Sequence, residues 1–207
     1  MQLLLAFALA RSSNCIDVGS NQGRVLADML RFAPEGSHIA YEPLPVLHEQ
    51  LTLRFPGVDV RKVALSDADG SSSFLHVKNL PEYSGLRRRA YPAKPNIELI
   101  EVLTERLDGH LPEHYVPDLI KIDVEGAEQL VIEGAMQTLK THQPIVLFEH
   151  GRGAAEYYGA SPTAIYHLLC DLAGLRIFDL DGNGPYSSKQ FAITFERNDR
   201  WNFVAHR

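Results

Sequence analysis

The chain has 207 residues, 45% hydrophobic and 22% charged, with a formal net charge of −6 at pH 7. This length is enough for one α/β domain with a sizeable core and excludes two domains of ordinary size. The acidic balance argues against a nucleic-acid backbone as the partner, and no apolar run is long enough for stable insertion into a membrane. We therefore predict a single domain over residues 1–207.

The N-terminal segment, residues 3–10, is apolar and has two interpretations. It could be the core of a short signal peptide, but no basic residue precedes it and a glycine-containing segment begins soon afterwards at Asp17. We interpret the segment as a helix packed on the domain and expect a cytoplasmic protein. The sequence leaves open whether the protein forms a homo-oligomer.

Strand and helix patterns alternate along the rest of the chain. Apolar or alternating runs typical of strands occupy residues 14–18, 37–41, 58–65, 71–77, 97–103, 118–124, 144–148, 175–180 and 201–206. Helical stripes occupy residues 22–33, 44–51, 127–135 and 161–172. Helices between successive strands predict an α/β, Rossmann-like fold. We expect a mostly parallel, seven-stranded sheet with helices on both faces and an antiparallel last strand allowed.

Residues 79–97 form a long, polar and proline-rich irregular stretch. Such stretches are usually lids, binding loops or disordered segments. It contains the only dense basic run, Arg87 to Arg89, which is either a solvated surface or a clamp for an anionic substrate.

Neither the cysteines nor the histidines indicate a metal site. Cys15 and Cys170 lie in apolar patterns and are expected as small core residues. The chain has no CxxC or HExxH spacing, so no metal ligands are predicted.

The first chemical signal is the segment DVGSNQG, residues 17–23, where the first predicted strand ends. Gly19 and Gly23 allow positive φ and a close approach to a ligand. A dinucleotide loop has three glycines and holds a pyrophosphate, which the carboxylate of Asp17 would repel. A turn with Ser20 and Asn21 between its glycines and an acid beside it suits a cationic ligand. S-adenosylmethionine carries an ammonium and a sulfonium group and no phosphate, while an ordinary tight turn is the alternative.

Two further carboxylates follow the next predicted strands. Glu42 could accept hydrogen bonds from both ribose hydroxyls of a nucleoside, or act as an acid at a helix N-terminus. Asp67 could accept the exocyclic amine of adenine, or belong to a simple turn, because Asp-Ala-Asp-Gly is good turn chemistry. Both residues are compatible with an adenosyl ligand.

The segment KIDVEGAE, residues 121–128, places four ionisable groups at the end of an apolar strand. Such groups are costly there unless they are paired or functional. Lys121 and Asp123 lie on the same strand face because side chains alternate along a strand.

These segments resemble the signature segments of FkbM-type methyltransferases. The similarity is carried by CIDVGSNQG, AYEP, VALSD, the Leu-Asp pair at 107–108, LIKIDVEGAEQLVIEGA and IVLFEH, in that order from residue 14 onwards. KIDVEGAE is the most specific of them, and one departure is Ser20, where the family usually has alanine. The resemblance implies a class I methyltransferase fold, S-adenosylmethionine as cofactor, and methyl transfer to a hydroxyl of a sugar, glycolipid or other natural product.

An alcohol acceptor must lose a proton during transfer, so a base is expected near the methyl group. Asp123 and His150, each at a predicted strand end, are the candidates, and Glu125 follows the first of them. Lys121 could keep Asp123 ionised or stabilise an alkoxide. The loop at 79–97 is expected to shape the acceptor site, so that trimming it would raise the acceptor KM more than the cofactor Kd.

Three other interpretations remain open. An NAD-dependent oxidoreductase could use the same sheet and Glu42, but should have three glycines at the turn. A non-catalytic nucleoside-binding domain would not need the ionisable cluster at residues 121–128. A metal-dependent catechol-type methyltransferase could use Asp123 and Glu149 as ligands.

Overall fold

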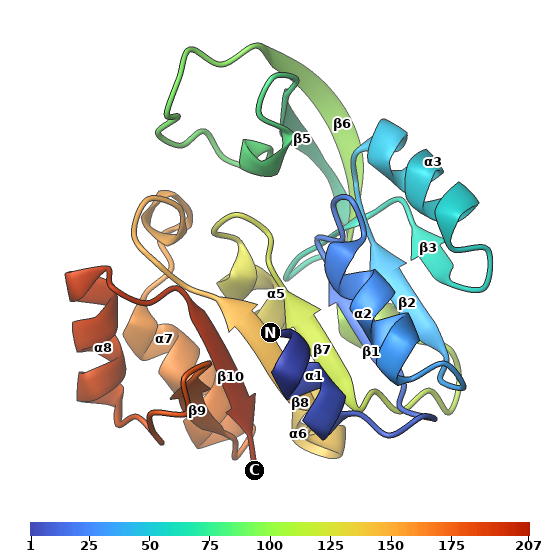
Figure 1. The fold of residues 1–207 in the computed structure, drawn as a ribbon. Coiled ribbons are helices and arrows are strands. Elements are labelled where there is room, and N and C mark those ends of the chain that lie inside the picture. Colours follow the sequence, from blue (N-terminus) through green and yellow to red (C-terminus); the bar gives the residue numbers. More distant parts are fainter.

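A seven-stranded sheet forms the centre of the computed structural model, which describes residues 1–207 (Figure 1). Its strands are β1 Cys15–Val18, β2 His38–Tyr41, β3 Asp59–Arg61, β7 Leu119–Ile122, β8 Ile145–Glu149, β9 Arg176–Asp179 and β10 Asn202–His206. Their order is β3-β2-β1-β7-β8-β10-β9. The pairs from β3 to β8 are parallel, and β10 is antiparallel to both of its neighbours. The predicted fold, including the antiparallel last strand, is confirmed.

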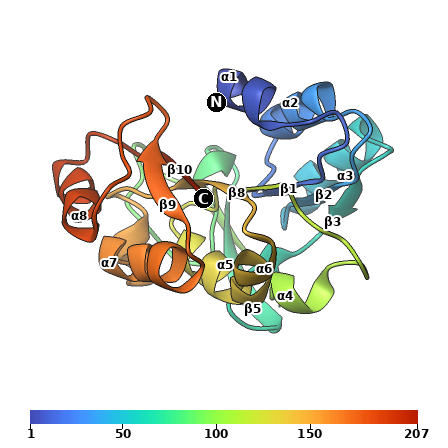
Figure 2. The same cartoon turned by 90° about the horizontal axis from the view of Figure 1, so that it is seen from below.

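Helices cover both faces of this sheet (Figure 2). One face carries α1 Gln2–Ala8, α2 Arg24–Phe32 and α3 Pro45–Arg54. The other carries α4 Leu107–His110, α5 Glu128–Gly134, α6 Met136–His142 and α7 Pro162–Tyr166, which continues as a π-helical segment, His167–Leu172. The N-terminal segment is a helix, as predicted, with Leu5 buried in the core. None of the helices is long and apolar enough to cross a membrane.

Helix α8, Ser188–Arg197, is absent from the predicted elements. It packs beside α7, and Phe191 enters the main core. A local signal for it exists, because Ser187 and Gln190 form a capping box at its start. The buried residues of this helix are Phe191 and Thr194, and because one of them is polar, no stripe of apolar residues marks the helix in the sequence.

The alternation of side chains along the central strands divides the core into two layers. Ile16, Ile120 and Val146 belong to the main cluster under α4 to α8, whereas Cys15 and Leu119 belong to the cluster under α1 and α2. Because side chains alternate along a strand, residues 17 and 121 lie on the same side of the sheet as Cys15 and Leu119, under α1 and α2. Both of these are charged residues in an otherwise apolar sheet.

The prediction of one strand over residues 58–65 is wrong. The segment divides into β3, which joins the central sheet, and β4, Ala64–Leu65, which leaves it. Strand β4 pairs with β6, Ile97–Glu105, and β6 pairs along its length with β5, Gly70–Val77. Figure 1 shows this β5–β6 hairpin standing off the central sheet. The loop between β5 and β6 is ordered by a short 3₁₀ helix, η1 Pro81–Tyr83.

Where one helix is predicted at residues 127–135, α5 ends at Gly134 and α6 begins two residues later. Asp108, in α4, supplies the acceptors that α6 needs at its start. Its carboxylate oxygens accept hydrogen bonds from the backbone N–H groups of Gln137 and Thr138, both at 2.8 Å. A buried carboxylate distant in sequence therefore caps this helix.

Replacing Asp108 with alanine should lower the free energy of unfolding by about 1 kcal/mol, because two N–H groups at a helix start lose their acceptors. Chemical denaturation measures this change. Asp199→Ala is the matched control, since Asp199 is exposed and makes no side-chain hydrogen bond or ion pair. Equal unfolding free energies for the two variants would show that the cap contributes nothing.

Candidate functional site

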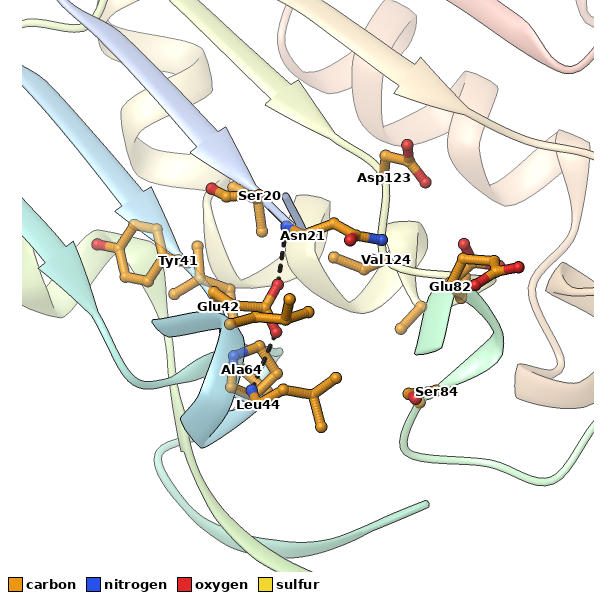
Figure 3. Close-up of a pocket in the computed structure, with 18 of the residues that line it drawn as sticks. Ser20, Asn21, Tyr41, Glu42, Leu44, Ala64, Glu82, Ser84, Asp123 and Val124 are labelled. Atoms are coloured by element: carbon orange, nitrogen blue, oxygen red, sulfur yellow. Dashed lines mark hydrogen bonds between the residues drawn. The ribbon is translucent and has the colours of Figure 1, made fainter. Parts of the chain in front are cut away.

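A cavity of about 560 Å³ lies between the carboxyl ends of the central strands and the β5–β6 hairpin (Figure 3). Its walls include the turn after β1, the residues after β2 and β7, and the loop that follows β5. The volume is within the usual range for a small-molecule site. In open α/β sheets ligands bind at this edge, so the cavity is the candidate site.

The turn after β1 requires glycine because it lies directly against the end of β7. Gly19 has φ of +74°, and a Cβ there would lie 1.9 Å from the carbonyl oxygen of Asp123. Gly23 has φ of +72°, and a Cβ there would lie 2.6 Å from the side chains of Leu51 and Phe55. The two glycines bring the turn close to β7 and to α3.

The N–H groups of this turn are already used within the protein. Gly19 and Ser20 donate to the carbonyl oxygen of Tyr41, at 3.0 and 3.1 Å. Asn21 donates to the carboxylate of Glu42 at 2.8 Å. A phosphate-binding loop presents such groups to its ligand, whereas this turn has no free N–H at these three positions.

Glu42 lines the cavity, and its carboxylate is largely buried and fixed in orientation by hydrogen bonds. Its second oxygen accepts the backbone N–H of Leu44 at 2.9 Å, which orients the group (Figure 3). Burial raises the pKa of Glu42 to about 7, although these N–H donors act in the opposite direction. Each carboxyl oxygen has further acceptor capacity for a ligand hydroxyl.

Lys121 is buried and paired below the turn. Its Nζ lies 3.1 Å from Asp17 Oδ1 and 3.7 Å from Asp123 Oδ2. It also donates to the carbonyl oxygens of Gly19, at 2.7 Å, and Val18, at 3.3 Å. Burial by itself lowers the pKa of Lys121, but the two carboxylates outweigh it and the pKa is raised. Asp17 is fully buried and does not line the cavity, so its charge interacts with Lys121 and not with a ligand in the cavity.

The chain after β7 carries Asp123 into the cavity. The Asp123 side chain is 43% exposed there, in contrast to the buried Lys121. The following residues turn sharply, with φ of +59° at Glu125 and +108° at Gly126. Glu128 holds this turn by accepting the N–H groups of Val124, at 2.9 Å, and Gly126, at 3.1 Å.

Glu125 joins this turn to the hairpin loop. It forms an ion pair with Arg89, whose guanidinium also lies 4.9 Å from the ring centroid of Tyr83. Burial and the neighbouring charge of Asp123 raise the pKa of Glu125 to about 7. Of the three arginines in the loop, Arg89 is therefore a buried ion-pair partner, while Arg87 and Arg88 are exposed.

The structure does not bring Asp67 or His150 to the cavity. Asp67 is exposed and accepts the hydroxyl of Ser66, because β4 has left the central sheet and carried this turn with it. His150 is buried, stacked 4.7 Å from the ring of Phe195, and neither ring nitrogen has a partner. Burial lowers the pKa of His150 to about 4. A place next to a predicted strand end therefore does not put either side chain in the cavity.

Sequence reasoning misses the apolar part of the cavity wall. Leu44, Ala64, Phe74 and Leu86 all line it. In the sequence these residues are indistinguishable from ordinary core positions, because nothing local shows that they meet around a cavity.

No group of three or more histidine, cysteine, aspartate or glutamate side chains is arranged to hold a metal ion. Glu149, the residue considered as a metal ligand with Asp123, is mostly buried. Burial and the charge of Asp123 raise its pKa far above the usual value. A protonated carboxyl group at this position would be a donor toward its neighbours.

Comparison with known proteins gives a consistent result. A family model described as the methyltransferase FkbM domain matches residues 17–173. Methyltransferase sdnD of Sordaria araneosa is 28% identical, in an alignment that covers 58% of this chain and 59% of sdnD. The chain thus spans less than two thirds of that relative.

Solved structures show the same fold. Methyltransferase FkbM from Methylobacillus flagellatus has a TM-score of 0.61 at 12% identity, covering 96% of this chain and 44% of that one. The plantazolicin methyltransferase BpumL, in complex with SAH and a triazolic desmethylPZN analog, has a TM-score of 0.52 at 11% identity. That match covers 99% of this chain and 82% of BpumL. The architecture is that of class I methyltransferases.

Proposed function

The chain belongs to the FkbM methyltransferase family, and from this premise we propose that it binds S-adenosylmethionine in the cavity and methylates a hydroxyl group. The acceptor is proposed to be a small molecule such as a sugar, a glycolipid or another natural product. Its identity and the cytoplasmic location are predictions from the sequence.

The main support for the proposed cofactor is the hydrogen bonding of the turn after β1. Its N–H groups are bonded to Tyr41 and Glu42, so they do not form a cradle for phosphate oxygens. The cavity is lined instead by the carboxylates of Glu42 and Asp123. These features suit an adenosyl ligand with a positive charge and no phosphate.

The residues present fit the two ends of this cofactor. The carboxylate of Glu42 can accept the vicinal ribose hydroxyls, and the acidic end of the cavity near Asp123 suits the ammonium and sulfonium charges. When bound, the cofactor supplies a methyl group on an electron-poor sulfur. The protein's contribution is then to hold the acceptor oxygen in line with the carbon–sulfur bond.

Asp123 is proposed to accept the proton that the acceptor hydroxyl loses. Of the two predicted bases it is the one that lines the cavity. The ammonium of Lys121 lies 3.7 Å from Asp123 Oδ2 and is also paired with Asp17. Lys121 is itself held by Asp17 and two carbonyl oxygens, so we assign it to positioning rather than to an alkoxide.

Isothermal titration tests the proposed cofactor. The protein is expected to bind S-adenosylhomocysteine and to give no heat with NAD at the same concentration, because the turn has no N–H cradle for a pyrophosphate. Incubation with labelled S-adenosylmethionine and candidate alcohols then tests transfer. Uptake of NAD without S-adenosylhomocysteine would contradict the proposal, and binding without transfer to any acceptor would favour a non-catalytic domain.

A further inference from the structure

The β5–β6 hairpin contributes to an apolar slot at one end of the cavity. Leu44, Ala64, Phe74 and Val102 form a buried cluster, and Leu86 packs against it. All of these except Val102 line the cavity. Two walls of the slot therefore come from the hairpin and its loop, through Phe74 and Leu86, and two from the segments after β2 and β3.

The slot lies beyond Glu42 as seen from Asp123. In Figure 3, Leu44 and Ala64 lie next to Glu42, on the side away from Asp123. The backbone N–H of Leu44 also bonds directly to the Glu42 carboxylate. A nucleoside with its ribose at Glu42 and its sulfur near Asp123 must extend its base into this slot.

We propose that the hairpin loop, through Leu86, is a wall of the adenine site and controls affinity for the cofactor. This inference rests on the proposed function and gives the loop a different role from acceptor selection, which the sequence suggests. A flat, weakly polar base suits a slot lined by Leu44, Ala64, Phe74 and Leu86.

The loop is fixed in place by contacts to three parts of the protein. Gly85 exchanges backbone hydrogen bonds with Leu75 of β5, at 2.8 and 3.2 Å. The backbone N–H of Arg87 donates to the hydroxyl of Tyr158, which follows β8, at 3.1 Å. Arg89 is paired with Glu125 after β7.

These tethers lie on both sides of Leu86, so its side chain is held at the slot before a ligand arrives. A preformed wall loses little conformational entropy on binding. Tyr158 is thus a positioning residue for the wall, and a Cβ at Gly85 would lie 2.8 Å from its hydroxyl oxygen.

The test compares Leu86→Ala with Leu99→Ala. Leu99 lies on the same hairpin but is 67% exposed and does not line the cavity. Leu86→Ala is expected to weaken S-adenosylhomocysteine binding about 10-fold or more, from the apolar area lost in the slot. Leu99→Ala is expected to change the Kd less than about twofold, since surface substitutions have small effects. Thermal unfolding of both variants without ligand checks that they are folded.

Titration with adenosine alone sharpens the test, because adenosine lacks the amino-acid end of the cofactor. If Leu86 contacts the base, Leu86→Ala should raise the Kd for adenosine and the Kd for S-adenosylhomocysteine by the same factor. If the parent protein binds S-adenosylhomocysteine and both variants bind it equally well, the inference is overturned while the proposed function stands. If the parent protein binds neither ligand, both are overturned.

Discussion

Asp123→Asn is expected to lower methyl transfer by about 10²–10⁴-fold, a much larger effect than its weakening of S-adenosylhomocysteine binding, to which the carboxylate contributes only through its charge. The amide keeps the size of the side chain but cannot accept a proton from the acceptor hydroxyl. The cofactor contacts proposed at Glu42 and in the apolar slot are distant from this change (Figure 3). Single-turnover transfer of labelled methyl, together with titration of S-adenosylhomocysteine, measures the two effects separately.

Asp199→Asn is the matched control for that experiment, because the same substitution is made at an exposed carboxylate outside the cavity. His150→Asn gives a second comparison, since His150 was the other predicted base and is enclosed beside Phe195. Normal turnover in Asp123→Asn would contradict the assignment. A large loss of turnover seen only in His150→Asn would instead identify His150, at the end of β8, as the base.

Lys121→Met is expected to lower the free energy of unfolding by about 3–5 kcal/mol, which is a large part of the stability of a typical domain. The substitution leaves the fully buried carboxylate of Asp17 without the ammonium 3.1 Å away. The carbonyl oxygen of Gly19 loses the Lys121 donor as well, and that of Val18 keeps only the backbone N–H of Asp123. Equilibrium denaturation with urea measures the loss.

The double variant Asp17→Asn/Lys121→Met separates an unpaired charge from lost packing. It is expected to recover much of the stability, because removing both charges of a buried pair costs less than removing one. Arg11→Met breaks an exposed ion pair with Glu35 and should change stability little. If Lys121→Met were as stable as Arg11→Met, the buried pair would not support the sheet.

Much of the architecture follows from local pattern. Short apolar strands alternate with helical stripes, and this alternation is sufficient to predict a parallel sheet covered on both faces. The glycines at residues 19 and 23, and the carboxylates of Glu42 and Asp123, were predicted at the carboxyl ends of strands and do line or shape the cavity. Strand ends can be located from sequence because apolar runs stop there.

Which strands pair, and which charges meet, was decided only in the folded chain. The run at residues 58–65 contains enough valine and other apolar residues to suggest one strand, yet β4 pairs with β6 and takes Asp67 away from the site. Asp17 was predicted to approach the ligand, but Lys121, from a strand far along the chain, holds it beneath the turn.

Apart from α8, the division of residues 58–65 into two strands and that of residues 127–142 into two helices, the sequence alone therefore determined the alternation of strands and helices. It also determined the glycine turn and the carboxylates at the strand ends, because these depend on residues close together in the chain. The tertiary structure decided that His150 is enclosed, that Arg89 pairs with Glu125 and that Leu86 completes an apolar slot. Those outcomes depend on contacts between distant segments, and local periodicity contains no information about which distant segments meet.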